Sequence, residues 1–163
     1  MATEELDPSG DGSVTEWGTQ SGSDHYAMID DGVRQPTAPT VPGTYINSSS
    51  SQTDEITIEA GELVNITEAT IWIYADQNNG DISGDISFDG GTSYTESPQE
   101  FDVTDPGWYS ITFSELSETN SATIEVKFTN AGIITPNFIY EAYVIVTGDE
   151  APAGQFMGMK KYW

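Results

Sequence analysis

Apolar and polar residues alternate through much of the chain between positions 54 and 147, with the period of two that is typical of half-buried β-strands. Residues 56–59 (ITIE) begin the pattern, and residues 101–103 (FDV) and 109–113 (YSITF) repeat it. The most regular example is residues 121–128 (SATIEVKF), in which alternate apolar side chains would share one face. We expect these segments to be strands with one face on a core and the other toward solvent.

Two further segments are largely apolar on both faces. The first is residues 70–75 (TIWIYA) and the second is residues 138–147 (FIYEAYVIVT). In the second segment, uninterrupted alternation would place one set of side chains on one face, Phe138, Tyr140, Ala142, Val144 and Val146, and a second set on the other, Ile139, Tyr143 and Ile145. Strands that are apolar on both faces are typically buried between layers. We therefore predict two central strands, and a neighbouring subunit could cover the second.

Turn-forming residues separate these segments at intervals of roughly ten residues. Residues 82–94 favour a hairpin, because the sequence DGG at residues 89–91 tolerates positive φ angles. Residues 35–51 contain Pro36, Pro39 and Pro42 and a run of serines, so they predict a long irregular connection. One short strand is expected within it, around residues 45–46.

The pattern as a whole indicates an all-β protein. No window shows apolar residues sustained at helical spacing, and residues 114–120 (SELSETN) could form at most one or two helical turns. Short strands with frequent turns predict a two-layer antiparallel β-sandwich of jelly-roll type. An immunoglobulin-like Greek key is an alternative, because the long connection fits either topology. We divide the chain into an N-terminal arm (1–12), a β-sandwich domain (13–147) and a C-terminal linker and docking tail (148–163).

The charge of the chain indicates the environment in which the protein functions. The 163 residues include 27 Asp and Glu against 4 Lys and Arg, a formal net charge of −23. Only 19% of residues are charged, below the roughly 25% of an average domain, so the imbalance reflects missing bases. Three explanations fit this excess of acidic residues: carboxylates clustered around a divalent cation, avoidance of like charges in a crowded assembly, or a high-salt environment. We favour the high-salt environment, because salt screens the repulsion between the negative charges of the protein. An ordinary acidic extracellular protein is the alternative.

Composition also excludes several classes of function. Direct nucleic-acid binding is not expected, because phosphate contacts need clustered bases and only Lys160 and Lys161 are adjacent. The absence of cysteine excludes disulfides and thiolate chemistry. No segment reaches the run of about 20 apolar residues that spans a bilayer, and residues 1–10 (MATEELDPSG) lack the features of a secretory signal. We expect a protein that is intracellular until assembled, or a mature chain.

Two turn segments resemble the first half of a calcium-binding loop, in which short oxygen ligands alternate. The candidate ligands are Asp7, Ser9 and Asp11 in the first segment and Asp76, Asn78 and Asp81 in the second. The twelfth position, where the motif requires a bidentate Glu, is Gly18 in the first case and Ser87 in the second. Glycine-rich turns between strands are therefore the favoured interpretation, with a calcium site built from loop oxygens as the alternative and no other cofactor expected.

No constellation in the sequence indicates catalysis, and we predict a protein that is not an enzyme. Glu141 is the carboxylate most clearly embedded in an apolar run, where burial would raise its pKa. Its more ordinary role is to face a polar neighbour or Lys127. His25 is the only histidine and no G-x-S-x-G nucleophile motif is present, so we expect His25 at the surface or at a strand edge.

Aromatic residues raise the possibility of a sugar-stacking platform like those of carbohydrate-binding jelly rolls. Trp72 lies in the most apolar segment and Trp108 begins another strand, so both are expected in the core. An exposed platform would rest on Trp17 or Tyr26.

The C-terminal segment 155–163 (QFMGMKKYW) combines aromatic rings, methionines and half of the bases of the chain. So much apolar surface on a free tail would be adhesive, so we expect the segment to dock on its own domain, a sister subunit or a larger scaffold. The docking residues would be Phe156, Met157, Met159, Lys160, Lys161, Tyr162 and Trp163.

Residues 7–19 (DPSGDGSVTEWGT), 26–31 (YAMIDD) and 44–46 (TYI), with residues 107–116 (GWYSITFSEL), resemble a β-sandwich module of structural proteins of tailed viruses. The resemblance covers roughly residues 5–147 and implies a virion component without catalytic residues. The acid-rich composition is similar to that of proteins from haloarchaea and their viruses.

These observations favour a non-enzymatic virion structural protein of a tailed virus of a halophilic host. It would be a capsid decoration, turret or tail component, assembled in the host cytoplasm as a symmetric homo-oligomer that contacts other virion proteins. The alternative is a carbohydrate-binding or adhesion module at a virion or cell surface, with a host-surface glycan as its partner. A glycan hydrolase is a distant third.

Overall fold

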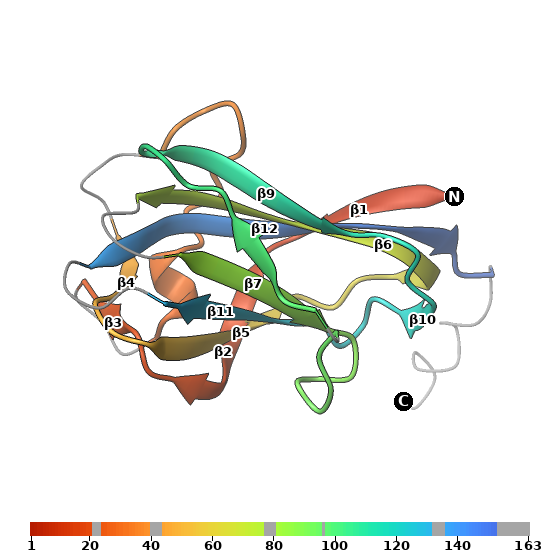
Figure 1. The fold of residues 1–163 in the computed structure, drawn as a ribbon. Coiled ribbons are helices and arrows are strands. Elements are labelled where there is room, and N and C mark those ends of the chain that lie inside the picture. Colours follow the sequence, from red (N-terminus) through yellow and green to blue (C-terminus); the bar gives the residue numbers. More distant parts are fainter. Residues whose placement is uncertain (21–23, 40–43, 77–80, 96, 132–135, 153–163) are drawn as a thin grey trace, which may run out of the picture.

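The computed structural model describes residues 1–20, 24–39, 44–76, 81–95, 97–131 and 136–152, and its two layers of strands are visible in Figure 1. The larger sheet, sheet A, contains β1 (Ala2–Leu6), β3 (Gly18–Thr19), β4 (Ile46–Ser48), β6 (Leu63–Asp76), β9 (Gly107–Phe113), β10 (Glu118–Asn120) and β12 (Asn137–Glu150). Sheet B contains β2 (Pro8–Thr15), β5 (Gln52–Ile58), β7 (Ile82–Ser87), β8 (Gln99–Phe101) and β11 (Glu125–Asn130). One short 3₁₀ helix, η1 (Tyr26–Met28), precedes the irregular connection.

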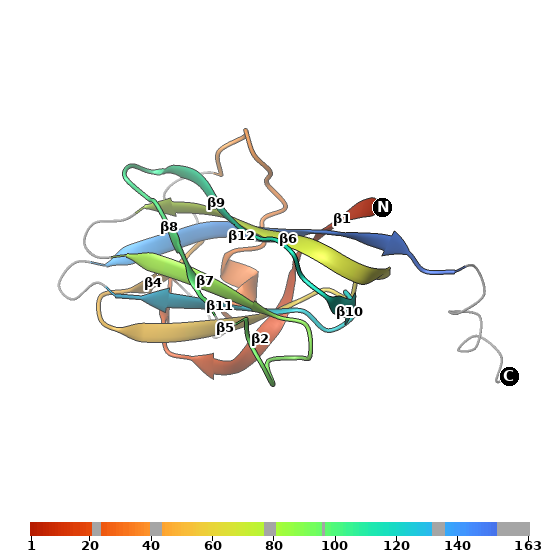
Figure 2. The same cartoon turned by 45° about the vertical axis from the view of Figure 1, so that its right-hand side comes forward.

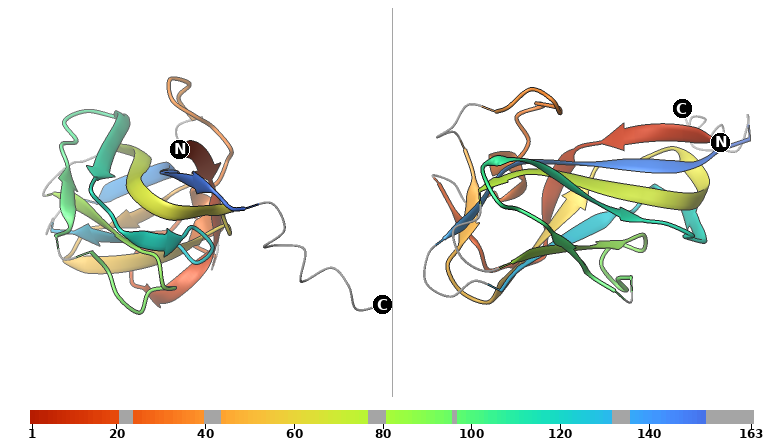
Figure 3. Two further views of the ribbon diagram at one scale, coloured as in Figure 1. Left: turned by 90° about the vertical axis from the view of Figure 1, so that its right-hand side faces the viewer. Right: turned by 45° about the horizontal axis from the view of Figure 1, so that its top comes forward.

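The order of strands confirms the predicted two-layer antiparallel β-sandwich. Sheet A has the order β10-β6-β12-β4-β3, with β1 on β12 and β9 on β6, and sheet B has the order β2-β5-β11-β7-β8. Consecutive strands change sheets from β5 to β6 and from β11 to β12, so most neighbours within each sheet are distant in sequence, as in a jelly roll. The pairs β3–β4 and β7–β8 are the exceptions among the described strands. Figure 2 and the end-on view in Figure 3 show the two layers facing each other.

The core lies between the sheets and is made mainly of branched aliphatic side chains. Its fully buried members include Ile56, Ile71, Ile73, Ile82, Ile86, Ile124, Phe101 and Phe128. Because successive side chains of a strand point to opposite faces, each strand that contributes to this core also presents a second set of side chains outward. In the part of the chain that the structure describes, no helix is long and apolar enough to cross a membrane.

The predicted faces of the last strand were wrong at its start, because β12 contains a bulge. Ile139 pairs with Ala75 and Glu141 pairs with Tyr74, so Tyr140 is an extra residue in the ladder. Before the bulge the alternation is therefore shifted by one. Ile139 belongs to the core, whereas the neighbouring rings of residues 138 and 140 contact one another outside it.

The first twelve residues, which we expected to form an arm, belong to the sandwich. β1 pairs with β12 in sheet A, and β2 pairs with β5 in sheet B. The apolar contribution of this segment is small, with Leu6 as its buried aliphatic side chain. Backbone hydrogen bonding to two sheets holds the segment, and alternation of apolar residues could not reveal it.

Two local predictions also changed. The turn at residues 89–91 is confirmed by positive φ angles at Gly90 and Gly91. The predicted hairpin partner was wrong, because β7 pairs with β11 and β8 rather than with residues 92–94. Residues 118–120, within the segment expected to form at most one or two helical turns, form β10 and pair with β6. Pairing with an existing strand provides backbone hydrogen bonds that a single helical turn cannot match.

Candidate functional site

The outer face of sheet A carries a continuous cluster of aromatic side chains, which we call the aromatic face. It consists of Tyr45, Trp72, Tyr74, Trp108, Phe138, Tyr140 and Tyr143. On β6, the buried residues Ile71, Ile73 and Ala75 point into the core, so the alternate side chains, those of residues 72 and 74, point outward. The aromatic face is thus the outward complement of the most apolar strand.

One half of the aromatic face is built from three adjacent strands. Tyr74 of β6 lies directly opposite Trp108 of β9, and their ring centres are 5.5 Å apart in an edge-to-face arrangement. Trp108 is also 5.7 Å from Tyr143 of β12. Tyr143 in turn stacks on Trp72 at 6.2 Å with an interplanar angle of 8°. These separations are those of favourable aromatic pairs, so the rings hold one another in place.

The other half lies toward β4. Tyr45 contacts Phe138 at 5.0 Å and Tyr140 at 5.9 Å, both edge to face. Tyr140 is 6.3 Å from Tyr74 and thereby joins the two halves. The bulge in β12 turns the ring of Tyr140 outward, and without it this connection would not form.

The rings differ in depth. Tyr140 and Tyr143 are 7% and 4% exposed and form the floor, whereas Tyr45, Trp72, Tyr74, Trp108 and Phe138 are partly exposed and available to a ligand. Burial, followed by the charge of Asp76, raises the pKa of Tyr140. Its hydroxyl therefore stays protonated at neutral pH and can donate a hydrogen bond.

Hydroxyl groups continue the same outer face beyond the rings. Ser110 of β9 is exposed and lies opposite Trp72. One step further along, the hydroxyls of Thr70 and Thr112 are hydrogen-bonded at 2.9 Å. The face therefore combines rings with polar groups that could bond to the hydroxyls of a ligand.

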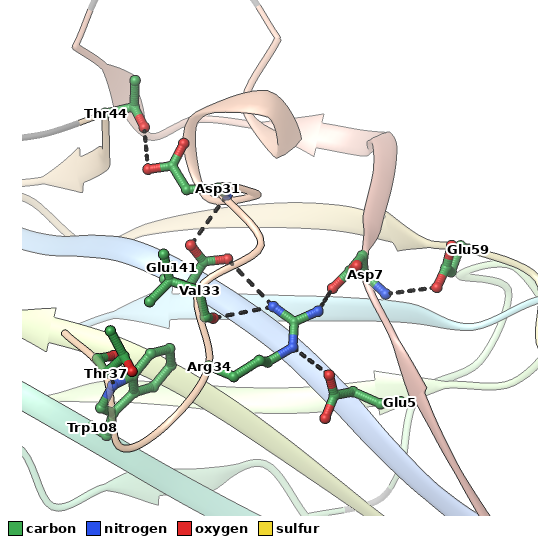
Figure 4. A network of polar contacts seen from close by, with 10 residues as sticks. All are labelled: Glu5, Asp7, Asp31, Val33, Arg34, Thr37, Thr44, Glu59, Trp108 and Glu141. Atoms are coloured by element: carbon green, nitrogen blue, oxygen red, sulfur yellow. Dashed lines mark hydrogen bonds and ion pairs between the residues drawn. The ribbon is translucent and has the colours of Figure 1, made fainter. Parts of the chain in front are cut away.

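The segment that follows η1 packs against one edge of the aromatic face, as Figure 4 shows. The guanidinium carbon of Arg34 lies 4.5 Å from the ring centre of Tyr143, a cation–π contact. Nε of Arg34 donates to Glu5 Oε1 at 2.5 Å, Nη2 donates to Asp7 Oδ1, and Nη1 donates to the carbonyl of Val33 at 3.1 Å. Arg34 thereby joins this segment to β1 and to the outer face of β12.

A second contact fixes the segment to the rings. Nε1 of Trp108 donates a hydrogen bond of 2.8 Å to the carbonyl oxygen of Thr37. The carboxylate of Asp31 accepts a hydrogen bond of 3.2 Å from the hydroxyl of Thr44, at the start of the chain that leads into β4. The segment is therefore attached at both of its ends.

Glu141 is fully buried beneath this segment. Its Oε2 accepts a hydrogen bond from the backbone N–H of Asp31 at 3.1 Å, and its Oε1 lies 3.9 Å from Nη1 of Arg34. Oε1 has no hydrogen-bond partner among the described residues. Burial raises the pKa of Glu141 to about 8. Of the two expected partners, a polar neighbour or Lys127, the structure shows the first. Lys127 is not the partner, because it belongs to β11 of the opposite sheet.

The two aromatic residues named from the sequence as a sugar platform do not form one. Trp17 is only 3% exposed, and its Nε1 donates to the carbonyl of Gln52 at 3.1 Å. Tyr26 is part of η1 and packs against the core. Trp72 and Trp108, which were expected in the core, lie on the aromatic face instead. The sequence contained evidence for the outward position of Trp72, because Ile71 and Ile73 share the core face and the residue between them must point to the opposite face.

His25, expected at the surface or at a strand edge, is buried. It is 8% exposed, and its Nδ1 lies 2.7 Å from Oδ2 of the fully buried Asp54 on β5. Burial raises the pKa of Asp54 to about 6, against the opposing effect of the hydrogen bond from His25. This pair ties η1 to sheet B, a tertiary contact that a lone histidine in the sequence could not reveal.

The five candidate calcium ligands that the structure describes do not form a metal-binding cluster. Asp7 is bound to Arg34, the hydroxyl of Ser9 donates to the carbonyl of Thr57 at 3.4 Å, and Asp11 accepts from the backbone of Tyr26. Asp76 ends β6, Asp81 precedes β7, and Asn78 lies outside the described residues. Within the described ranges, no group of three or more acidic or histidine side chains is arranged to hold a metal ion. A calcium site stays a prediction.

The outer face of sheet B carries polar and charged side chains, unlike the aromatic face of sheet A. Lys127 lies between Glu55 and Asp85 in the ladder, and its Nζ is 3.7 Å from the ring centre of Tyr94. The hydroxyl of Tyr94 donates to Glu125 at 2.7 Å, and burial together with this bond raises its pKa. The lysine of this face is thus surrounded by carboxylates.

Neither a family model nor a curated protein matches this chain. Among solved structures, the C-terminal CBM6 of LamC, a marine laminarinase from Zobellia galactanivorans, is 7% identical with a TM-score of 0.48, covering 90% of this chain and 99% of that one. The CBM36-1 domain of a multidomain xylanase from the hindgut metagenome of Trinervitermes trinervoides is 9% identical with a TM-score of 0.48, covering 92% and 100%. The K3 cleaved adhesin domain of Lys-gingipain from Porphyromonas gingivalis is 14% identical with a TM-score of 0.47, covering 90% and 100%. The candidate site therefore rests on its own geometry.

Several expectations stay predictions. The docking residues 156–163 lie outside the described residues. The virion role, the halophilic host and the homo-oligomer are not tested by any described contact or by the comparisons.

Proposed function

We propose that this protein is a non-catalytic carbohydrate-binding module and that its glycan ligand stacks on the aromatic face. The carrying observation is the continuity of that face, in which rings from β9, β6, β12 and the segment before β4 contact one another across sheet A. Half-buried rings held by their neighbours are a rigid surface, so little side-chain entropy is lost when a ligand covers them.

The chemistry of sugars supports this assignment. One face of a pyranose ring presents C–H groups, which pack favourably on the electron-rich face of an aromatic ring. The hydroxyls at the edge of the sugar need hydrogen-bond partners, and Ser110, Thr70 and Thr112 supply such groups on the same sheet face. A surface of rings bordered by hydroxyls therefore fits a glycan chain laid across the strands.

Three carboxylates near the face, Glu5, Asp7 and Glu141, accept hydrogen bonds that hold the neighbouring segment, which supports a binding role over a catalytic one. Glu141 accepts from the backbone of Asp31, and Glu5 and Asp7 accept from Arg34. These groups hold the segment after η1 in position.

Isothermal titration calorimetry with soluble neutral oligosaccharides of glucose, mannose, xylose and galactose tests the proposal. We expect at least one series to bind, and Trp72→Ala to weaken that binding at least tenfold, which corresponds to about 1.4 kcal/mol. Tyr94→Ala is the matched control, because it removes a partly exposed ring from the outer face of sheet B. Binding that survives Trp72→Ala and Tyr74→Ala with the fold intact by circular dichroism would refute the site.

A further inference from the structure

In the described part of the chain, little positive charge lies near the aromatic face. Of the four bases in the sequence, Lys160 and Lys161 fall in the final segment, beyond the described residues. Lys127 belongs to sheet B and contacts Tyr94. Arg34 is therefore the base that adjoins the aromatic face in the described part of the chain.

Each of the three guanidinium nitrogens of Arg34 already donates a hydrogen bond within the protein. Nε and Nη2 are directed at the carboxylates of Glu5 and Asp7, and Nη1 donates to the carbonyl of Val33 (Figure 4). A guanidinium recognises a carboxylate or sulfate through a free pair of N–H donors. An acidic sugar would have to compete with two carboxylates of the protein for this guanidinium.

Carboxylates also border the aromatic face elsewhere. Asp76, at the end of β6, lies opposite Phe138 in the ladder, and its charge acts on the nearby hydroxyl of Tyr140. Asp31 is exposed at the segment that covers Glu141. Charges on two sides of the rings, on a protein of net charge −23, give this face a negative potential that repels anions at low ionic strength.

From this arrangement we infer that the aromatic face selects uncharged glycans and rejects those that carry uronic acids or sulfates. The inference rests on the proposed function and specifies its ligand class. The aromatic rings can stack on any pyranose ring, charged or uncharged. The surrounding carboxylates repel only the glycans that carry uronic acids or sulfates. Specificity of this kind is a difference between two affinities and needs the repulsive element as much as the attractive one.

The direct test compares each neutral oligosaccharide with its C6-oxidised form, in which the same backbone carries carboxylates. Cello- and manno-oligosaccharides and their oxidised derivatives are titrated at 20 and 500 mM NaCl. We expect the oxidised chain to bind at least tenfold more weakly at low salt, and the difference to narrow at high salt. Equal or tighter binding of the oxidised chain, lost on Trp72→Ala, would overturn the inference and leave the proposed function standing. Failure of all four neutral series of the first titration, together with the oxidised chains, would refute the proposed function itself.

A gain of binding provides the second arm. The double variant Glu5→Gln and Asp7→Asn releases Arg34 from both carboxylates, so the ratio of affinities for oxidised and neutral chains is expected to rise at least fivefold. The control is the double variant Glu62→Gln and Glu150→Gln. It removes the same amount of charge from exposed positions next to the start of β6 and at the end of β12, away from the aromatic face. An unchanged ratio in the first variant, or an equal rise in both, contradicts the inference. Both affinities are measured on the same variant, so a general loss of stability affects them equally and does not change their ratio.

Discussion

Arg34 and Tyr143 are in direct contact, with the guanidinium carbon 4.5 Å from the ring centre, although the two residues are far apart in the chain. The contact joins the irregular segment after η1 to the floor of the aromatic face. The same guanidinium reaches Glu5 and Asp7 and lies 3.9 Å from Glu141. A single base therefore connects β1, β12 and the segment that borders the candidate site.

Removal of Arg34 is expected to destabilise the protein. Arg34→Ala removes the ion pairs with Glu5 and Asp7 and the cation–π contact with Tyr143. We expect a loss of about 1–3 kcal/mol in the free energy of unfolding, below the value for a fully buried pair because these groups are partly exposed. Urea denaturation at pH 7 measures the loss. Arg34→Lys should show a smaller loss, since it keeps the charge and lacks the planar fork. Equal stability of the wild type and Arg34→Ala would contradict this role.

Stability should fall as pH rises through the neutral range. The pKa of Glu141 is raised from 4.5 to about 8 in the folded protein, so the folded state retains a proton that the unfolded chain releases. This contribution is complete below pH 4.5 and is lost as pH approaches about 8. Since each pKa unit corresponds to about 1.4 kcal/mol, we expect a decrease of at least about 2 kcal/mol. Denaturation at a series of pH values should show a flatter profile in Glu141→Gln.

The raised pKa of Asp54 predicts a second pH range in which the stability of the protein changes. Its folded-state pKa is raised from 3.8 to about 6, so its contribution is complete below pH 3.8 and is lost by about pH 6. Asp54→Asn should remove the share of the dependence below about pH 6 that Asp54 causes, and should leave the dependence between pH 4.5 and about 8 that Glu141 causes. A profile that Asp54→Asn alters only above pH 7 would contradict the assignment.

Trp17 should behave as a core residue. Trp17→Ala is expected to lower the free energy of unfolding by about 3–5 kcal/mol, because it removes a large buried side chain and leaves a cavity. Trp17→Phe should retain glycan affinity within twofold in the titrations described above. A selective loss of glycan binding in folded Trp17→Phe would restore the platform that the sequence suggested.

Salt should stabilise the protein. With a net charge of −23, self-repulsion is expected to be screened as NaCl rises from 0.1 to 2 M, with an increase in Tm on the order of 5 °C. Differential scanning calorimetry measures the change. A Tm that falls with salt would argue against the high-salt environment favoured by the composition.

The sequence by itself determined the class of fold and much of the core. Alternation marks β5, β9 and β11, the buried run marks β6, and these patterns persist in the structure because a strand of period two has only one way to bury its apolar side. The turn at Gly90 and Gly91 was readable for a similar local reason, since few residues tolerate positive φ.

Tertiary structure decided the site. One extra residue at Tyr140 shifted the alternation of β12, and backbone pairing brought residues 1–15 into both sheets. Cross-strand register placed Trp72 against Tyr143 and Trp108 against Tyr74, and a long connection brought Arg34 over them. Each of these depends on which strands become neighbours, and that choice is made by contacts between residues far apart in the chain, which a local pattern does not encode.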